Sequence, residues 1–280
     1  MRWLVVPVAL FVAACSQPSV GTEESADGRD PAAVVAALRP LDPCALIGGG
    51  ERLGPHRCTA DGAFTGDALR VDIGVWDDPA TPVTGERLDL AGSLGLRRKF
   101  DDSCVVDLPA GADLVIRFTY QGSSAGTACT EVTEAATAAV TALADPPRVA
   151  APHLDACTAL TRSGADLGDL AVRFSEVQHG LDLCQARADV EGGWETRYSV
   201  QLLDGDVRPG GATVAGAAVE VRETGDSCEY TWSVQPGVLL RLSAPDCAET
   251  ETLATTLVPI AADPADAVEP QHPITLPAAG

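Results

Sequence analysis

The sequence predicts an α+β protein built of two tandem, homologous domains. We expect each domain to contain a mostly antiparallel sheet of about five strands, flanked by an N-terminal and a C-terminal helix and held by two disulfides. Three observations carry this prediction. A four-cysteine pattern occurs twice, the strand segments are joined by hairpin-type turns, and each repeat has helix patterns at its two ends. Short hairpin links with helices at the ends are typical of α+β rather than βαβ folds.

The two halves of the chain share a cysteine pattern. One half opens with Asp42-Pro43-Cys44-Ala45-Leu46, and the other opens with Asp155-Ala156-Cys157-Thr158-Ala159-Leu160. Each half then has an Asp-Ser-Cys motif and a last Cys followed by x-Glu; the cysteines of these motifs are Cys104, Cys129, Cys228 and Cys247. Because each half carries a complete pattern, the 280 residues are interpreted as two domains rather than one.

The domain boundaries follow from composition and from helix-breaking residues. The two prolines at 146–147 end a helix and make a stiff linker between the repeats. A polar, acidic stretch precedes the first repeat, and an acidic Pro/Ala-rich stretch follows the second. The predicted parts are a signal peptide (1–14), a lipidated flexible tether (15–30), the first domain (31–145), a Pro linker (146–150), the second domain (151–262) and a disordered tail (263–280).

The helices are predicted from their start patterns and apolar faces. Asp-Pro pairs at 30–31 and 42–43 offer a capping carboxylate and a residue suited to the first helical position. The expected helices cover 31–38, a short turn from 43, about 129–143, a short stretch from about 155, and the residues after Cys247.

The strands are predicted from alternation of apolar and polar residues. The clearest case is 69–75, where four aliphatic residues alternate with Arg, Asp and Gly, as in a half-buried strand. The expected strands cover 56–60, 69–75, 87–90, 104–108 and 114–120 in the first domain, and 183–190, 198–202, 218–222, 228–234 and 238–242 in the second.

The first fifteen residues resemble a secretory signal that ends in a bacterial lipobox, Val12-Ala13-Ala14-Cys15. In that class the Cys thiol carries diacylglycerol, and two or more acyl chains hold a protein stably on a membrane. The chain has nine cysteines, so assigning Cys15 to lipid leaves four per repeat. We therefore expect anchoring to the extracytoplasmic face of the cell membrane through Cys15. The alternative is a plain secretory signal with Cys15 as a stray thiol.

The other eight cysteines are expected to form structural disulfides, because an exported protein meets an oxidising environment. Four cysteines allow three pairings, and the sequence alone does not choose between them. Hairpin geometry favours first with second and third with fourth, because the strand that starts at Cys104 lies beside the end of its partner, a short loop before Cys129. The favoured pairs are Cys44–Cys58, Cys104–Cys129, Cys157–Cys184 and Cys228–Cys247. Zinc is the rival use, but the chain has no Cys-x-x-Cys and no His-x-x-x-His motif.

The charge balance excludes some partners. The chain has 40 acidic and 19 basic residues, a net charge of −21. Binding of nucleic acid and attraction to anionic lipid both need Lys and Arg, so neither is expected. Scattered carboxylates usually keep a protein soluble and monomeric, and a cation-binding surface is the less favoured alternative. We expect a monomer with no cofactor and no bound metal.

One catalytic pattern does occur. Gly122-Ser123-Ser124-Ala125-Gly126 fits G-x-S-x-G, which would make Ser124 the nucleophile of an envelope hydrolase. That turn belongs to parallel βαβ sheets, whereas this chain shows hairpins, and the same loop of the second repeat has no nucleophile. The sequence therefore does not support an enzyme, and a serine hydrolase stays an alternative.

The remaining residues of chemical interest have simpler structural explanations. A lone loop histidine is usually solvated, and acidic turns without regularly spaced oxygen ligands are not calcium loops. Trp76 has the opposite parity to the 69–75 alternation, so we expect it to leave the core face and either pack under the next loop or anchor a partner or glycan. The residues considered are His56, His153, His179, His272, Asp77-Asp78, Asp101-Asp102, Asp204-Gly205-Asp206, Trp76, Trp194 and Trp232.

Five features occur together in this sequence: the lipobox, the acidic tether, the Asp-Pro-Cys-Ala-Leu motif on a first helix, a Cys on the first strand and a Cys opening the last helix. In this combination the chain resembles an actinobacterial family of secreted Asp-Pro-Cys lipoproteins of unknown function. The α+β unit of that family is similar to extracellular sensor domains of some actinobacterial receptor-type Ser/Thr kinases. The resemblance covers about 41–145 well and about 154–262 more loosely, where Ala156 replaces the proline. It implies an envelope binding or scaffolding module and supplies no catalytic residues.

The sequence thus predicts a non-catalytic, lipid-anchored envelope protein that binds a ligand or protein partner, whose identity stays open. The groove between the two like domains is the expected binding site. A purely structural spacer is the remaining alternative.

Overall fold

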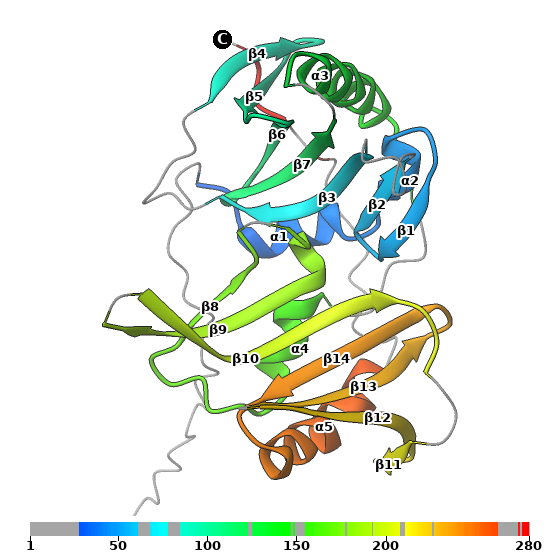
Figure 1. The fold of residues 1–280 in the computed structure, drawn as a ribbon, viewed down its shortest axis with the longest axis vertical. Coiled ribbons are helices and arrows are strands. Elements are labelled where there is room, and N and C mark those ends of the chain that lie inside the picture. The colour runs from blue at the N-terminus through cyan, green and yellow to red at the C-terminus, as the bar shows by residue number, and fades with distance from the viewer. Residues whose placement is uncertain are drawn as a thin grey trace, which may run out of the picture.

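The fold is described from a computed structural model. The described residues are 28–60, 68–77, 85–122, 125–146, 148, 155–176, 178–191, 193–207, 211–225, 227–262, 274 and 276–279. Figure 1 shows two sheets, one above the other, each with its own helices. The predicted signal peptide and most of the predicted tether lie outside the described residues.

The described part of the first domain contains three helices and one seven-stranded sheet. Its elements are α1 (Pro31–Leu38), α2 (Pro43–Leu46), β1 (Glu51–Gly54), β2 (Arg57–Ala60), β3 (Ala68–Trp76), β4 (Glu86–Leu90), β5 (Ser93–Lys99), β6 (Ser103–Gly111), β7 (Leu114–Gln121) and α3 (Ala125–Ala142). The strand order is β1-β2-β3-β7-β6-β5-β4, and each neighbouring pair is antiparallel.

The described part of the second domain repeats this plan. Its elements are α4 (Ala156–Arg162), β8 (Ala171–Phe174), the short 3-10 helix η1 (Gly180–Asp182), β9 (Leu183–Val190), β10 (Gly193–Asp204), β11 (Ala212–Val214), β12 (Ala217–Thr224), β13 (Ser227–Gln235), β14 (Val238–Ala244) and α5 (Cys247–Ala261). Read from β8, the order is β8-β9-β10-β14-β13-β12-β11, which matches the first sheet strand for strand. The repeated cysteine pattern therefore corresponds to a repeated topology.

The α+β class and the two-sheet organisation are confirmed, but the expected count of about five strands per domain is wrong. The additional strands are β1, β5, β8 and β11. Three of these have only three or four residues, too few for a period of two to become visible. β5 has the sequence SLGLRRK, in which only two leucines alternate with small or polar residues before three basic residues, and it still pairs on both sides.

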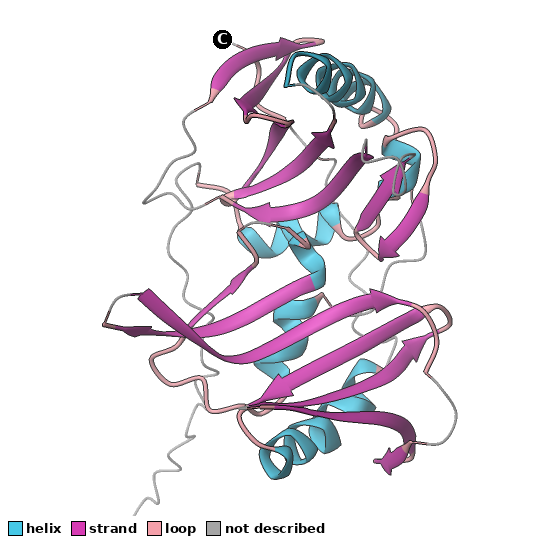
Figure 2. Cartoon of the chain, viewed as in Figure 1, coloured by secondary structure: helices cyan, strands magenta, loops and turns pink. Residues whose placement is uncertain are grey.

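The helices are also arranged differently from the prediction. They do not flank the sheet at two ends but pack together on one face of it, as Figure 2 shows for α4 and α5 of the second domain. In the first domain, α2 and α3 contribute Leu46 and Val132 to one core with β3 and β7, and α1 is an additional helix with Val34 and Leu38 in the same core. The other face of each sheet is left for other contacts.

The helix starts are formed as their sequences predict. The Asp30 carboxylate accepts a hydrogen bond from the backbone amide of Ala32, and the Asp42 carboxylate accepts one from Cys44. Pro31 and Pro43 occupy the first helical position, where no amide hydrogen is needed. Each Asp-Pro pair therefore fixes the residue at which its helix begins.

Four disulfides attach the helices to the sheets. In each domain the first cysteine is joined to the second and the third to the fourth, which is the pairing that hairpin geometry favours. The bonds are Cys44–Cys58 (α2 to β2), Cys104–Cys129 (β6 to α3), Cys157–Cys184 (α4 to β9) and Cys228–Cys247 (β13 to α5). The register places Cys104 opposite Tyr120, as the hairpin argument requires.

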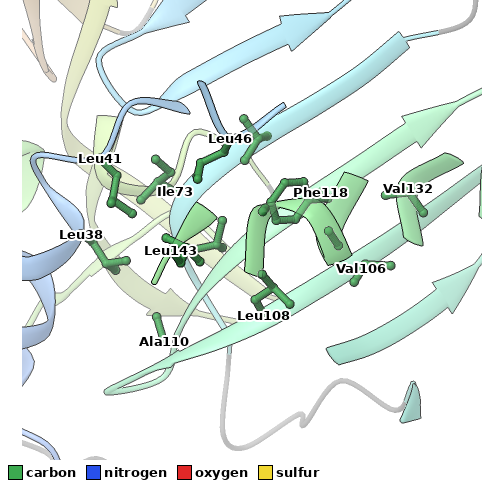
Figure 3. Packing of buried hydrophobic residues seen from close by; sticks show 14 of the residues in the cluster. Leu38, Leu41, Leu46, Ile73, Val106, Leu108, Ala110, Phe118, Val132 and Leu143 are labelled. Carbon is green, nitrogen blue, oxygen red and sulfur yellow. The ribbon is translucent and has the colours of Figure 1, made fainter. Parts of the chain in front are cut away.

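The core of the first domain is aliphatic, with Phe118 as a fully buried aromatic residue. Figure 3 shows Ile73 and Phe118 from the sheet facing Leu46, Val132 and Leu143 from the helical side. The second core is built likewise, with Trp232 fully buried within it. Since apolar burial contributes about 25 cal/mol per Å², small aliphatic residues must cover much area to hold such domains, and the disulfides add to that stability.

Part of the predicted disordered tail is placed against the first domain. Ile274 and Leu276 pack on the first core, and Ala278 forms an antiparallel bridge with Ser93. Among the helices that the structure describes, none is both long and apolar enough to span a bilayer.

Candidate functional site

A row of alternating charges crosses the face of the first sheet that points away from the core. The register places Arg57, Asp72, Arg117 and Asp107 side by side on β2, β3, β7 and β6. Arg57 Nε lies 3.3 Å from Asp72 Oδ1, and Arg117 Nε donates to Asp107 Oδ1 at 2.7 Å. All four side chains are buried. We call these four residues the charge row; it is buried because another part of the chain covers it.

The cover is the described part of the segment 175–182 of the second domain, which leads from β8 to β9. The backbone amide of His179 donates to Asp72 Oδ1 at 3.1 Å, and the carbonyl oxygen of Glu176 accepts from Arg117 Nη1 at 2.8 Å. The second domain thus completes hydrogen bonds of charges that would otherwise need water. Hydrogen bonds between the domains therefore occur in the interface where the sequence predicts a ligand groove.

A fully buried histidine–aspartate pair joins the two domains. His56 Nδ1 lies 2.7 Å from Asp182 Oδ1, and neither side chain is exposed. Asp182 Oδ2 also accepts from the His56 backbone amide at 3.1 Å, while His56 Nε2 lies 3.0 Å from the carbonyl oxygen of Arg39. Both ring nitrogens are therefore within hydrogen-bond distance of an oxygen atom. No ring nitrogen of His56 is left to transfer a proton in catalysis.

The aspartate that opens the second repeat has a second role in this interface. Asp155 Oδ1 accepts from the backbone amide of Thr158 as a helix cap, and Oδ2 accepts from Arg39 Nη2 at 2.8 Å. Its counterpart Asp42 caps α2 and pairs with Arg52 within its own domain. The same motif residue therefore holds a helix in both repeats but holds the domains together only in the second.

His179 is a half-buried, neutral member of the interface. Its backbone has a φ of 79°, in the left-handed region, and its Nδ1 accepts a hydrogen bond from the Arg57 guanidinium. Burial, followed by the positive charge of Arg57, lowers the pKa of His179 from 6.5 to about 4. The imidazole is therefore uncharged at neutral pH, as an acceptor must be.

At the rim of the interface, two tryptophans are linked through charged residues. The Arg173 guanidinium lies 4.6 Å from the ring centroid of Trp76, and that of Arg187 lies 3.7 Å from the ring centroid of Trp194. Glu176 stands between the two arginines, 3.9 Å from Arg173 and 2.8 Å from Arg187. We call these five residues the tryptophan–arginine row. It spans both domains, since Trp76 belongs to the first and the others to the second.

Trp194 is the most accessible ring of this row, with 54% of the residue exposed on the β9–β10 hairpin. The hairpin extends sideways from the body of the domain (Figure 1). Arg187 Nη2 donates to Gln185 Oε1 at 2.5 Å, and Gln185 Nε2 donates to Thr196 Oγ1 at 3.4 Å. The indole is thus held by an anchored guanidinium beside hydroxyl and amide groups on the same face of the sheet.

The predicted site residues have different fates in the structure. His56 and His179 belong to the interface, so the expectation that they are solvated loop histidines is wrong. The prediction that Trp76 leaves the core face is wrong, because the bulge between Ile73 and Val75 places Trp76 opposite Leu114 of the core and Trp76 packs against that core. The Arg173 guanidinium covers its ring. The residues outside the described part of the chain are Cys15, Ser124, Asp78, His153 and His272.

Where the structure describes them, the acidic turns show no grouping that would suit a metal. Asp77 belongs to one of these turns, and its carboxyl group is partly buried. Burial, followed by the charge of Asp107, raises the pKa of this carboxyl group. Within the described residues, no three His, Cys, Asp or Glu side chains come close enough together to hold a metal ion.

Sequence reasoning missed the charge row and the tryptophan–arginine row. Asp72 and Arg70 were interpreted only as the polar side of a half-buried strand, and that side is covered by the second domain. One indication was available: Arg57, Asp72, Asp107 and Arg117 all lie in predicted strands, where charges of opposite sign can pair across strands. The contribution of 175–182 was not detectable, because this segment has no recognisable pattern.

Comparison of the chain with known protein families, with curated proteins and with solved structures finds no match in any of the three. The geometry of the two domains is therefore the basis of the functional argument.

Proposed function

We propose that this chain is a lipid-anchored, non-catalytic binding protein of the bacterial cell envelope, and that its binding surface is the tryptophan–arginine row. The proposed ligand is a saccharide chain of the envelope. The observation that carries this proposal is Trp194, a large indole that is 54% exposed and yet fixed by Arg187. A ring that is held in place loses little conformational entropy when a ligand stacks on it.

The neighbouring groups suit a saccharide. A sugar ring offers an apolar C–H face that can cover an indole and hydroxyl groups that need hydrogen-bond partners. Gln185 and Thr196 supply an amide and a hydroxyl next to Trp194, and Glu176 supplies a carboxylate acceptor that is 34% exposed. Arg173, partly exposed beyond Glu176, extends the same row toward the first domain. The row can therefore accommodate more than one sugar unit.

The lipid anchor and the resemblance to Asp-Pro-Cys lipoproteins belong to the same proposal. The Asp-Pro-Cys motif has a physical role in this fold, since Asp42 caps α2, Pro43 is its first residue and Cys44 ties it to β2. In the second repeat, Asp155 and Cys157 keep the cap and the disulfide without the proline. An envelope glycan would be within reach of a protein attached to the outer face of the membrane.

The alternative of a serine hydrolase that uses Ser124 has weaker support. The strand before this serine is β7, which is antiparallel to both neighbours, whereas a nucleophile elbow follows a strand of a parallel sheet. His56 lies beside Ile73, which is opposite Ile116, and β7 runs on from Ile116 to Gln121 over roughly 17 Å. His56, with both nitrogens bonded, thus lies at the other end of the strand.

The test is a titration of residues 16–280, made without the lipid, with oligosaccharides of the cell envelope, followed by tryptophan fluorescence and calorimetry. We expect saturable binding by the wild type and at least about tenfold weaker binding by Trp194→Ala, the effect of losing ~1.4 kcal/mol. Phe100→Ala is the matched control, because Phe100 is 49% exposed but lies outside the row. It should bind like the wild type.

Other outcomes would decide against the proposal. Equal loss of binding in Phe100→Ala would mean that the row is not the site. No response to any saccharide would rule out the glycan. Cross-linking from position 194 to a specific envelope protein would then favour a protein partner, and the absence of any cross-link would favour a structural spacer.

A further inference from the structure

The C-terminal segment of the chain returns to the first domain. α5 ends at Ala261 in the second domain, but residues 274 and 276–279 lie beside β5, where the C-terminus is marked in Figure 1. The Leu94 amide donates to the carbonyl oxygen of Pro277 at 2.8 Å, and the Ala279 amide donates to the carbonyl oxygen of Gly92 at 3.1 Å. The segment is therefore bound through its backbone, as an additional strand would be.

The C-terminal segment lies where β6 leaves the first residues of β5 without a partner. β5 pairs with β6 from Leu96 to Lys99, but its first residues have no partner on β6. β6 continues beyond Asp107 on β7 alone and contains Pro109, which has no amide hydrogen to donate. Without the C-terminal segment, the Leu94 amide would face an open position in the sheet. The segment fills that position.

The side chains of the segment add to this attachment. Ile274 and Leu276 are half-buried and pack against the first hydrophobic core, while Ala278 is exposed. Two apolar anchors two residues apart, with backbone hydrogen bonds beyond them, form the pattern by which an exposed sheet edge binds an extended peptide. The backbone hydrogen bonds supply affinity, and the packing of the two apolar side chains on the core supplies selectivity.

We propose that the first domain contains a peptide-binding site at the start of β5, specific for an extended segment with the pattern Ile-x-Leu-Pro-Ala, and that the chain's own C-terminus occupies it as a detachable strap. This site is distinct from the tryptophan–arginine row and does not depend on the proposed function. A strap that binds in cis also closes a sheet edge that could otherwise pair with another chain.

The first test uses the full chain. Leu276→Asp places a charge on the apolar anchor, and Ala278→Asp places the same charge two residues away on an exposed position. We expect the Leu94 amide to exchange its hydrogen about tenfold faster or more in Leu276→Asp, a change of ~1.4 kcal/mol, and at the wild-type rate in Ala278→Asp. Unchanged exchange in Leu276→Asp would overturn the proposal.

The second test asks whether the site works in trans. A synthetic peptide of residues 271–280 is added to the chain that ends at residue 273, or to full-length Leu276→Asp if the shortened chain does not fold. We expect saturable binding and restored protection of the Leu94 amide, with no effect of the same peptide carrying Leu276→Asp. Protection of the Phe118 amide from hydrogen exchange reports that the first domain is folded. If the folded protein does not bind the peptide, the segment is not a separable ligand.

Discussion

The Nδ1 atom of His56 in the first domain lies 2.7 Å from Oδ1 of Asp182 in the second, and both side chains are fully buried. Separation of the domains would leave these two polar groups without the partner that each has in the interface. The two domains are therefore expected to unfold together, although each has its own core and its own disulfides.

Removal of one partner of this pair should strongly destabilise the protein. We expect Asp182→Ala to lower the free energy of unfolding by about 3–5 kcal/mol, because the ring and the backbone amide of His56 are left buried without their partner. Urea denaturation at pH 7 measures this change. Glu86→Ala is the control: Glu86 pairs with Arg97 but its side chain is 62% exposed, so the expected loss is below about 1 kcal/mol. Equal losses in the two variants would contradict the role given to Asp182.

The free energy of unfolding should decrease on mild acidification, because His179 is protonated more readily in the unfolded chain than in the folded protein. Burial and Arg57 lower the pKa of its imidazole from 6.5 to about 4. Between these two values the unfolded chain binds a proton that the folded protein does not, so the free energy of unfolding decreases as the pH falls from 6.5 toward 4. His179→Asn keeps a residue that tolerates the left-handed φ of 79° but does not titrate.

Denaturation of both proteins between pH 7.5 and 4.5 checks this effect. The difference in unfolding free energy between wild type and His179→Asn should become smaller, or change sign, as the pH falls. A difference that stays constant over this range would mean that His179 is already protonated or not coupled to folding.

Close approach of the domains should make Gly180 irreplaceable. Its φ is +47°, and a Cβ atom built on it would lie 2.0 Å from the carbonyl oxygen of Ile73 in the first domain. Gly216, in the β11–β12 turn, has a φ of +86° but nothing within 4 Å of the same atom. Gly216→Ala should cost about 1–2 kcal/mol for the backbone alone. Gly180→Ala should cost a further ~1–3 kcal/mol for the clash.

The measurement is the urea midpoint of the two alanine variants against the wild type. Gly180→Ala should also speed hydrogen exchange of the Trp76 amide, which donates to the carbonyl oxygen of Ser175 across the interface. Equal midpoints for the two variants would argue that the interface adapts without cost.

The lipid anchor rests on Cys15, so Cys15→Ser should release the protein from the membrane. A serine hydroxyl cannot form the thioether bond that carries the diacylglycerol. Without acyl chains, nothing in the predicted tether binds a bilayer. Fractionation of cells that express each form, with mass spectrometry of the mature N-terminus, measures the change. Persistence of Cys15→Ser in the membrane fraction would point to another means of attachment.

The local chemistry of the chain was sufficient to predict much of the fold. Asp30-Pro31 and Asp42-Pro43 specify helix starts through one side-chain hydrogen bond each, which needs no distant contact. The alternation in β3 and the hairpin of β6 and β7 depend only on neighbouring residues and a turn. β1, β5, β8 and β11 could not be predicted, because their pairing is imposed by the strands beside them rather than by their own sequences.

The candidate site was less predictable, because its members come from both domains. Arg187 lies in a predicted strand, but Trp194 falls between the strands predicted at 183–190 and 198–202, and the contact of Arg187 with Glu176 depends on how residues 175–182 dock. His56 begins a predicted strand with no sign of a buried polar partner nearby, and its contact with Asp182, more than a hundred residues later, accounts for its burial. Burial of a polar residue by another domain leaves no periodic pattern in the sequence.

The two like domains contact each other through unlike surfaces: the first offers the charge row, and the second offers the segment 175–182. Contacts of this head-to-tail kind can in general be repeated from copy to copy and grow into filaments. Here both surfaces are used within one chain. The charge row binds Glu176 and His179 in cis, whereas the first domain joins β1 to β2 through Pro55 and His56 alone and so has no counterpart of that segment. Two repeats of the same topology thus take different roles, one as the donor of a docking segment and the other as its acceptor.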